Sequence, residues 1–338
     1  MSFEFLSNLW FFLLALVWGI YLAQEMFIAG SSILASSFRK DNEKFEVINN
    51  AIGTHWDGIQ VWLILAVGGT FAAFPNAFAS ILSNLYIPIF LLLYLIIFRG
   101  ISIETIDKSH GKLSTVLKWC WFISSAGLLV VLGVYSANMF IGLPLNADGL
   151  MNDSFFSFLS IFGMVPIFTA LMFVLYALVM GSLFLKMNVE KVVSNKFDKL
   201  IKIGSLFASL FLILIFVGLN AKGNIFNRGL FEDIPYLFAL PIASCLLSVV
   251  GGIAAFKGKY LLAFIFMALG MLLFMITGYL SLVPDFVFST LDPANSLSIA
   301  NGAAGEQTLM VMFVSTCIFL PIVLIYQGYK YIRFWGNK

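Results

Sequence analysis

The sequence predicts an all-α, polytopic membrane protein with nine transmembrane helices. The 338 residues are 61% hydrophobic and only 11% charged, with a mean hydropathy of +1.00. A soluble domain carries about 25% charged residues. The apolar residues also gather into long segments, and an α-helix needs about 20 such residues to cross a lipid bilayer. Composition and segment length together therefore indicate a chain built inside the membrane.

Nine segments are long and apolar enough to span. They cover residues 9–31, 58–78, 80–98, 119–143, 157–185, 203–220, 234–256, 260–283 and 307–329. The first has no basic residue before it and no small-residue cleavage site after it, so we expect a retained helix rather than a signal peptide. Turn signals at Pro75-Asn76 and Ser83-Asn84 separate the second segment from the third.

Lysine and arginine predict the orientation, because short cytoplasmic loops carry an excess of both. Seventeen of them fall on one side of the membrane when the N-terminus is placed outside: Arg39, Lys40, Lys44, Arg99, Lys108, Lys112, Lys118, Lys186, Lys191, Lys196, Lys199, Lys202, Lys257, Lys259, Lys330, Arg333 and Lys338. Only Lys222 and Arg228 fall on the other side. We therefore expect residues 1–338 to form a single membrane domain with an external N-terminus and a cytoplasmic C-terminus.

Several classes of protein are excluded by composition and motif. The net charge is only +2, and no basic cluster is interleaved with aromatic residues, so nucleic acid is not an expected partner. The three cysteines lie apart in apolar stretches and form no C-x-x-C pair, which argues against a metal site or a disulfide framework. No Walker, Rossmann or zinc-protease motif is present.

Ionisable residues within apolar segments are the candidate functional residues, because a charge in lipid is costly. Glu25 lies in the first segment, Asp57 at the start of the second, Arg99 at the end of the third and Glu306 at the start of the ninth. The predicted boundaries place Asp57 and Arg99 at similar depth on the same side of the membrane.

Asp57 has a structural interpretation and a functional one. Thr54-x-x-Asp57 matches a capping box, in which Thr54 begins a helix and the acid returns a hydrogen bond to it. The same carboxylate could carry protons, with Gln60, three residues further on, as its hydrogen-bond partner.

The other candidates also have structural alternatives. Trp56 and Trp62 fit an interfacial aromatic belt. Glu25 could be paired with Gln24 or with a neighbouring helix, and Arg99 could extend to the lipid headgroups as an anchor. His55 is the one histidine near a membrane face, which is a weak signal for haem or metal ligation.

Three stretches resemble subunit II of the cytochrome bd-type quinol oxidases. These are "HWDGIQVW" at 55–62, "FR" at 98–99 and "NSLSIANGAAGEQTL" at 295–309. The first matches every fixed position of the family's H-W-D-G-x-Q-V-W pattern. The number of spans and the external N-terminus also agree, so the resemblance covers the whole chain.

The resemblance implies a chain of the bacterial cytoplasmic (inner) membrane with two four-helix bundles and one peripheral helix. Its partner would be subunit I, which carries haems b and d and the site where quinol is oxidised while dioxygen is reduced to water. This chain would bind no haem or metal itself, although a quinone or lipid can be bound in it, and a small accessory membrane subunit can join the complex. The resemblance assigns Asp57 to proton entry from the cytoplasm, with Trp62 in the same region and Arg99 close to the site.

The sequence departs from the family pattern at two places. The family often has two acids near the end of the first helix, as D-G-F-D-x-G, whereas "EMFIAG" has Glu25 at the first and Ile28 at the second. We expect Glu25, one turn away, to take the place of the missing acid. The family arginine is often followed by proline, and here Gly100 follows Arg99.

A secondary transporter or a stand-alone proton-conducting protein is the alternative function. The odd number of spans and the lack of a matched pair of broken helices both argue against it, because many transporters are built from inverted repeats.

Overall fold

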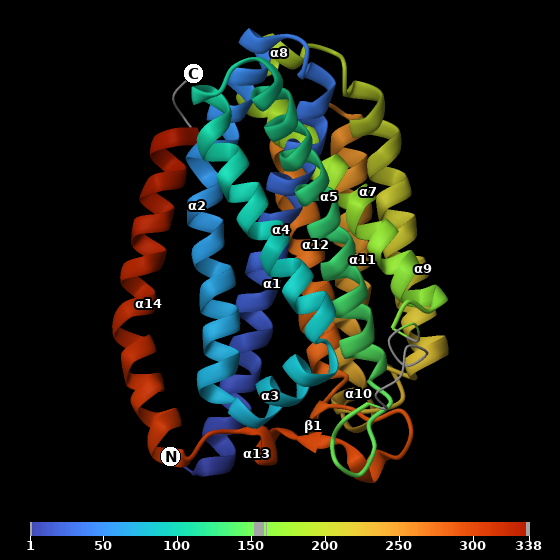
Figure 1. Ribbon diagram of the computed structural model, residues 1–338. Coiled ribbons are helices and arrows are strands. Elements are labelled where there is room, and N and C mark those ends of the chain that lie inside the picture. Colours follow the sequence, from blue (N-terminus) through green and yellow to red (C-terminus); the bar gives the residue numbers. More distant parts are fainter. Residues whose placement is uncertain (1, 152–158, 160, 336–338) are drawn as a thin grey trace.

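The computed structural model describes residues 2–151, 159 and 161–335. In those residues, nine helices are long and apolar enough to cross a membrane, as the sequence predicts. They run side by side along one axis, and α1 begins at the opposite end of the molecule from where α14 ends (Figure 1). The spanning elements are α1 (Phe3–Ala35), α2 (Asn42–Ala73), α4 (Tyr86–Thr105), α5 (Gly111–Ile141), α7 (Met164–Asn188), α9 (Ser205–Gly223), α11 (Ala239–Phe256), α12 (Tyr260–Leu280) and α14 (Glu306–Trp335).

Short elements close the two ends of the bundle. Figure 1 shows α8 (Glu190–Val193) at one end, and α3 (Pro75–Asn84), α10 (Leu230–Asp233), β1 (Asp285–Val287) and α13 (Ile299–Gly302) at the other. The remaining short elements are η1 (Ser36–Phe38), η2 (Ile106–Lys108), the π-helical turn η3 (Leu200–Gly204), η4 (Pro235–Phe238), η5 (Pro293–Asn295) and β2 (Leu297–Ser298). β1 and β2 pair antiparallel. The amide of Ala304 donates to Ala73 O at 2.8 Å, which ties the last long loop to the end of α2.

Helices α1 and α7 form the centre of the bundle. A methyl group on Gly30 would lie 1.7 Å from Ala177 O, and one on Gly181 would lie 2.3 Å from Ser31 N, so only glycine permits this crossing. Small residues allow this close approach of helix backbones in lipid, where packing rather than the hydrophobic effect joins helices. Helix α14, by contrast, stands at the edge beside α2 (Figure 1), and only 6% of its spanning window is buried.

Helix α2 begins far earlier than predicted, and this overturns the capping box. It starts at Asn42, with Asp41 as its N-cap accepting a hydrogen bond from Lys44 N at 3.2 Å. Thr54 lies in the middle of the helix, where its hydroxyl donates to Asn50 O at 2.8 Å. The reason is an apolar stripe at helical spacing before the membrane segment, formed by Phe45, Ile48 and Ile52, which are all buried.

The predicted third span, 80–98, is also displaced. The turn signals mark the short helix α3, which starts at Pro75 and ends at Asn84, and α4 then continues from Tyr86 to Thr105. Proline is favoured in the first turn of a helix because it lacks an amide hydrogen that would go unpaired there. Arg99 therefore lies inside a helix rather than at its end. The predicted start of the fifth span, residue 157, lies outside the described residues.

Candidate functional site

Glu25 and Arg99 form an ion pair in the interior of the protein. Both side chains are 0% exposed, although they come from α1 and α4 and lie 74 residues apart. Arg99 Nη1 and Nη2 donate to the two carboxylate oxygens of Glu25, the second at 3.0 Å. A bidentate pair of this kind is the strong form of a charge-assisted hydrogen bond. The prediction that Glu25 is paired with a neighbouring helix is confirmed, and the prediction that Arg99 anchors to headgroups is wrong.

The pair retains unused hydrogen-bonding capacity. Arg99 Nε is buried and has no hydrogen-bond partner among the described residues. An arginine side chain carries five N–H donors, and a buried donor without a partner is costly. The geometry therefore leaves a donor at the pair that could hold water or a polar group from another chain.

Asp57 lies on the outside of the chain, beside a tryptophan that reaches α4. The neighbouring residue Trp56 packs on Gly100 of α4, where an added methyl group would lie 3.2 Å from Trp56 Cη2. Gly100 follows Arg99, so the residue before Asp57 contacts the residue after Arg99. The Asp57 side chain is exposed, and no ion pair within 4.0 Å involves it in the described part of the chain.

Several buried polar atoms near Asp57 have no hydrogen-bond partner among the described residues. Trp56 Nε1 and both amide atoms of Gln60 are buried and make no hydrogen bond to the described residues. The predicted hydrogen bond from Gln60 to Asp57 is therefore absent. Buried polar atoms in native proteins are nearly always satisfied, so this part of α2 is expected to meet water or another chain.

Trp62 and His55 lie on other faces of α2. Trp62 is 4% exposed and lines an apolar groove between α1, α2 and α14. Trp62 comes five residues after Asp57, which corresponds to a rotation of about 140° around the helix axis, so the two side chains lie on different faces of α2. The burial of Trp62 rules out the interfacial aromatic belt for this residue. His55 is 6% exposed, and its ring meets that of Phe184 edge-on at 5.5 Å.

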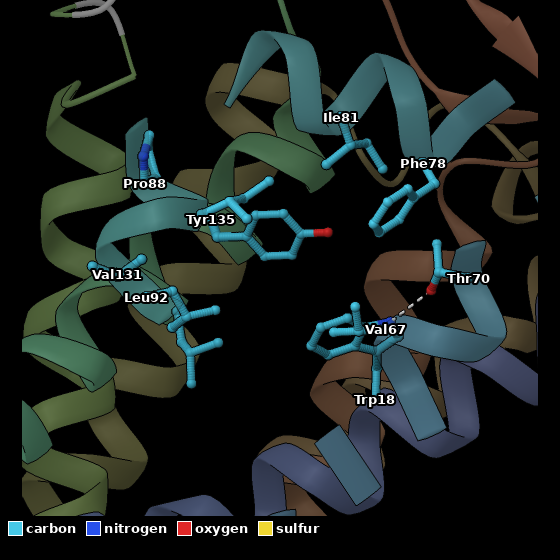
Figure 2. A pocket seen from close by; sticks show the side chains of 11 residues that line it. Trp18, Val67, Thr70, Phe78, Ile81, Pro88, Leu92, Val131 and Tyr135 are labelled. Carbon is cyan, nitrogen blue, oxygen red and sulfur yellow. Dashed lines mark hydrogen bonds between the residues drawn. The ribbon is translucent and has the colours of Figure 1, made fainter. Parts of the chain in front are cut away.

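A second cavity, of about 90 Å³, opens between α1, α2, α3, α4 and α5. Its walls are almost entirely apolar (Figure 2). Trp18 Nε1 donates to Thr70 Oγ1 at 3.3 Å at one side of it, and the Tyr135 hydroxyl points into it from the other side (Figure 2). Sequence reasoning missed these residues, because single polar side chains in apolar helices give no pattern before the helices are packed.

No group of three or more histidine, cysteine or acidic side chains that could hold a metal ion is found in the part of the chain that the structure describes. Among those residues, the candidate chemistry therefore rests on Asp57 and on the buried pair of Glu25 and Arg99.

Comparison with known proteins identifies the family. The sequence profile of cytochrome bd terminal oxidase subunit II matches residues 6–334. This chain belongs to that family. It is 29% identical over 334 residues to cytochrome bd ubiquinol oxidase subunit 2 of Bacillus subtilis, covering 97% of this chain and 96% of the relative. It is 24% identical over 366 residues to cytochrome bd-I ubiquinol oxidase subunit 2 of Escherichia coli K12, covering 99% and 96%.

The fold agrees with the family. A chain of the bd oxidase from Geobacillus thermodenitrificans superposes with a TM-score of 0.74 and 17% identity, covering 98% of this chain and 99% of that one. Membership of a terminal oxidase subunit family decides against the alternative of a transporter or a stand-alone proton-conducting protein.

Both departures from the subunit II pattern have a structural setting. Ile28 is fully buried in the central core of the bundle, so it contributes packing at the position where the family often has its second acid. Gly100 leaves room for the ring of Trp56, with which a larger side chain would collide unless the ring moved. At this second position the small residue accommodates the Trp56 ring that reaches from α2 to α4.

Proposed function

We propose that this chain is the non-haem subunit II of a quinol oxidase of the bacterial cytoplasmic membrane, and that Asp57 takes up protons there from the cytoplasm. The partner, subunit I, carries haems b and d, oxidises quinol and reduces dioxygen to water. Family membership and the names of the relatives support this assignment. The observation that carries the role of Asp57 is its place on the exposed face of α2, next to Trp56, whose ring contacts the residue that follows Arg99.

Asp57 is suited to exchange protons because its carboxylate is exposed and makes no ion pair with the described residues. Lys44 pairs with Asp41 and Arg99 pairs with Glu25, so neither cation is committed to Asp57. The unpaired Trp56 and Gln60 groups would hold water or partner atoms beside it.

Glu25 and Arg99 have a supporting role in this proposal. The ion pair of Glu25 and Arg99 carries no net charge as a whole, so it can remain in the interior of the membrane-spanning bundle. Its positive end, with a free Nε donor, would attract negative charge or oriented water inward from Asp57. Glu25 thereby takes the place of the acid that Ile28 replaces. Trp62 contributes through packing of α2 on α1 and α14.

The arrangement of helices fits the remaining expectations. Helices α1, α2, α4 and α5 pack with one another, as do α7, α9, α11 and α12, which supports two four-helix bundles with α14 as the peripheral helix. The cavity of Figure 2, with its apolar walls and the Tyr135 hydroxyl, is the place where this chain would hold a quinone or a lipid chain. A small accessory membrane subunit would join the pair along an exposed helix face.

Asp57→Asn tests the proton route. The side chain keeps its size and a carbonyl acceptor but cannot exchange a proton near neutral pH. We expect the complex to assemble with all its haems and to lose most quinol-oxidase turnover and proton uptake. Asp57→Glu restores a titratable group on a longer stem and should recover part of the rate with a shifted pH profile.

Glu43→Gln is the matched control, because it removes an exposed acid from the first turn of the same helix. It should turn over at the parental rate. If Asp57→Asn also turns over at the parental rate with all haems present, Asp57 carries no protons and the proposed route is wrong.

A further inference from the structure

Two lysines stand over an apolar groove at the end of the bundle where α8 lies. The groove has a volume of about 500 Å³ and is lined by Lys196 and Lys199 together with Leu175, Leu200, Ile203, Gly204 and Phe207. It lies between α7 and the start of α9, and three of its lining residues, Leu200, Ile203 and Gly204, belong to the π-helical turn η3. π-Helical turns inside α-helices are frequent at functional sites.

The acids of this segment do not neutralise the two lysines. Asp198 and Glu190 both pair with Lys186, with Nζ to oxygen distances of 3.1 and 3.6 Å. Lys186 is 5% exposed, so its ion pairs hold both acids at that residue. No carboxylate of the described residues lies within 4.0 Å of Lys196 or Lys199. The groove therefore carries a local positive charge.

Lys196 is held in position with donors to spare. Its Nζ donates to Ser37 O at 3.1 Å and lies 4.1 Å from the centroid of the Phe38 ring. A lysine ammonium has three N–H donors, so Lys196 is anchored and still able to bind an anion. Lys199 is exposed and lies three residues further on, before the spanning part of the chain.

Below the lysines the surface is apolar. Ile203 and Phe207 are 41% and 52% exposed, although both lie within the span that starts at Leu200. Two ammonium groups at the end of a span, above an exposed apolar groove, match the two parts of a phospholipid: a negatively charged headgroup and an acyl chain. Basic pockets between transmembrane helices bind anionic lipid headgroups for this reason.

We propose that the groove formed by Lys196, Lys199, Leu175, Ile203 and Phe207 binds one anionic phospholipid. The phosphate lies between the two ammonium groups, and an acyl chain follows the groove between α7 and α9. The inference rests on the proposed membrane topology, which places this groove in the cytoplasmic leaflet. It is independent of the route by which protons enter.

Lipid binding to the purified complex in mild detergent tests this site. Native mass spectrometry would follow phosphatidylglycerol added to delipidated complex, with phosphatidylcholine of the same acyl chains and inorganic phosphate as the comparison probes. The variant Lys196→Gln with Lys199→Gln should lose one tightly bound phosphatidylglycerol, with roughly thirtyfold weaker binding, because each lysine contributes to attraction by an anionic surface. Leu175→Trp, which fills the groove and keeps both lysines, should lose the same lipid.

The matched control is Lys191→Gln with Lys202→Gln, which changes the net charge equally in the same segment but outside the groove. It should retain the lipid. The proposal is overturned if both double variants lose binding equally, if phosphatidylcholine binds as tightly as phosphatidylglycerol, or if inorganic phosphate occupies the site as well as the lipid does. The readout is lipid occupancy and not turnover, so a failure of the Asp57 route would leave it unaffected.

Discussion

Glu25→Gln should destabilise the protein strongly, because it leaves a buried charge without its partner. Arg99 is 0% exposed, and both of its terminal nitrogens donate to Glu25. The amide of glutamine has one carbonyl oxygen and no charge, so it can accept from Arg99 but cannot neutralise it. Removing one partner of a buried ion pair costs about 3–5 kcal/mol. We expect a loss of that size in the free energy of unfolding.

The reciprocal change and the double change make this prediction sharper. Arg99→Met leaves Glu25 without its cation in the same interior and should also lower the stability, because burial of an unpaired polar group is costly. Glu25→Met with Arg99→Met replaces both charges by apolar side chains of similar length, and such replacements are often neutral or stabilising. The double variant should therefore be more stable than either single variant.

Thermal unfolding of the purified complex, followed by tryptophan fluorescence, is the measurement, and the exposed Glu43→Gln variant is the control. If both single variants melt at the same temperature as the parent, the argument that a buried residue left without its partner destabilises the protein is refuted. Turnover of the double variant adds a second reading, since a stable but slow enzyme would show that the pair also serves proton transfer.

Two further predictions concern topology and pH. Reporter fusions at Lys196 and Asn301 should give opposite signals, because the charge pattern places residues 186–202 in the cytoplasm and 284–306 outside; equal signals would contradict the nine-span topology. Burial raises the pKa of the Asp285 carboxyl above its ordinary value of 3.8. Just above pH 3.8 the folded chain therefore binds more protons than the unfolded chain, and the free energy of unfolding falls as the pH rises through the folded-state pKa. Asp285→Asn, which does not ionise, should thus melt higher than the parent at neutral pH and show no such gain below pH 3.8; a gain that is the same at both pH values would count against this reasoning.

The sequence by itself determined the class of the protein, the number of spans and the family. Hydropathy is a local property that does not depend on how the helices pack. The nine apolar segments can therefore be counted along the sequence. The motif at 55–62 was equally local, and its resemblance to subunit II agrees with the family match over residues 6–334. Helix boundaries were less secure, because the membrane part of α2 was visible in hydropathy and its amphipathic extension from Asn42 was not.

Only the tertiary structure decided how the polar residues are used. The sequence marks Glu25 and Arg99 as residues that are costly in lipid. Their pairing depends on the rotation and depth of α1 and α4, because the two residues are 74 positions apart in the chain. The same holds for Lys186, which draws Glu190 and Asp198 to itself and leaves Lys196 and Lys199 above an apolar groove. A sequence records which charges exist, whereas the packing of helices determines which of them neutralise one another and which remain to bind something else.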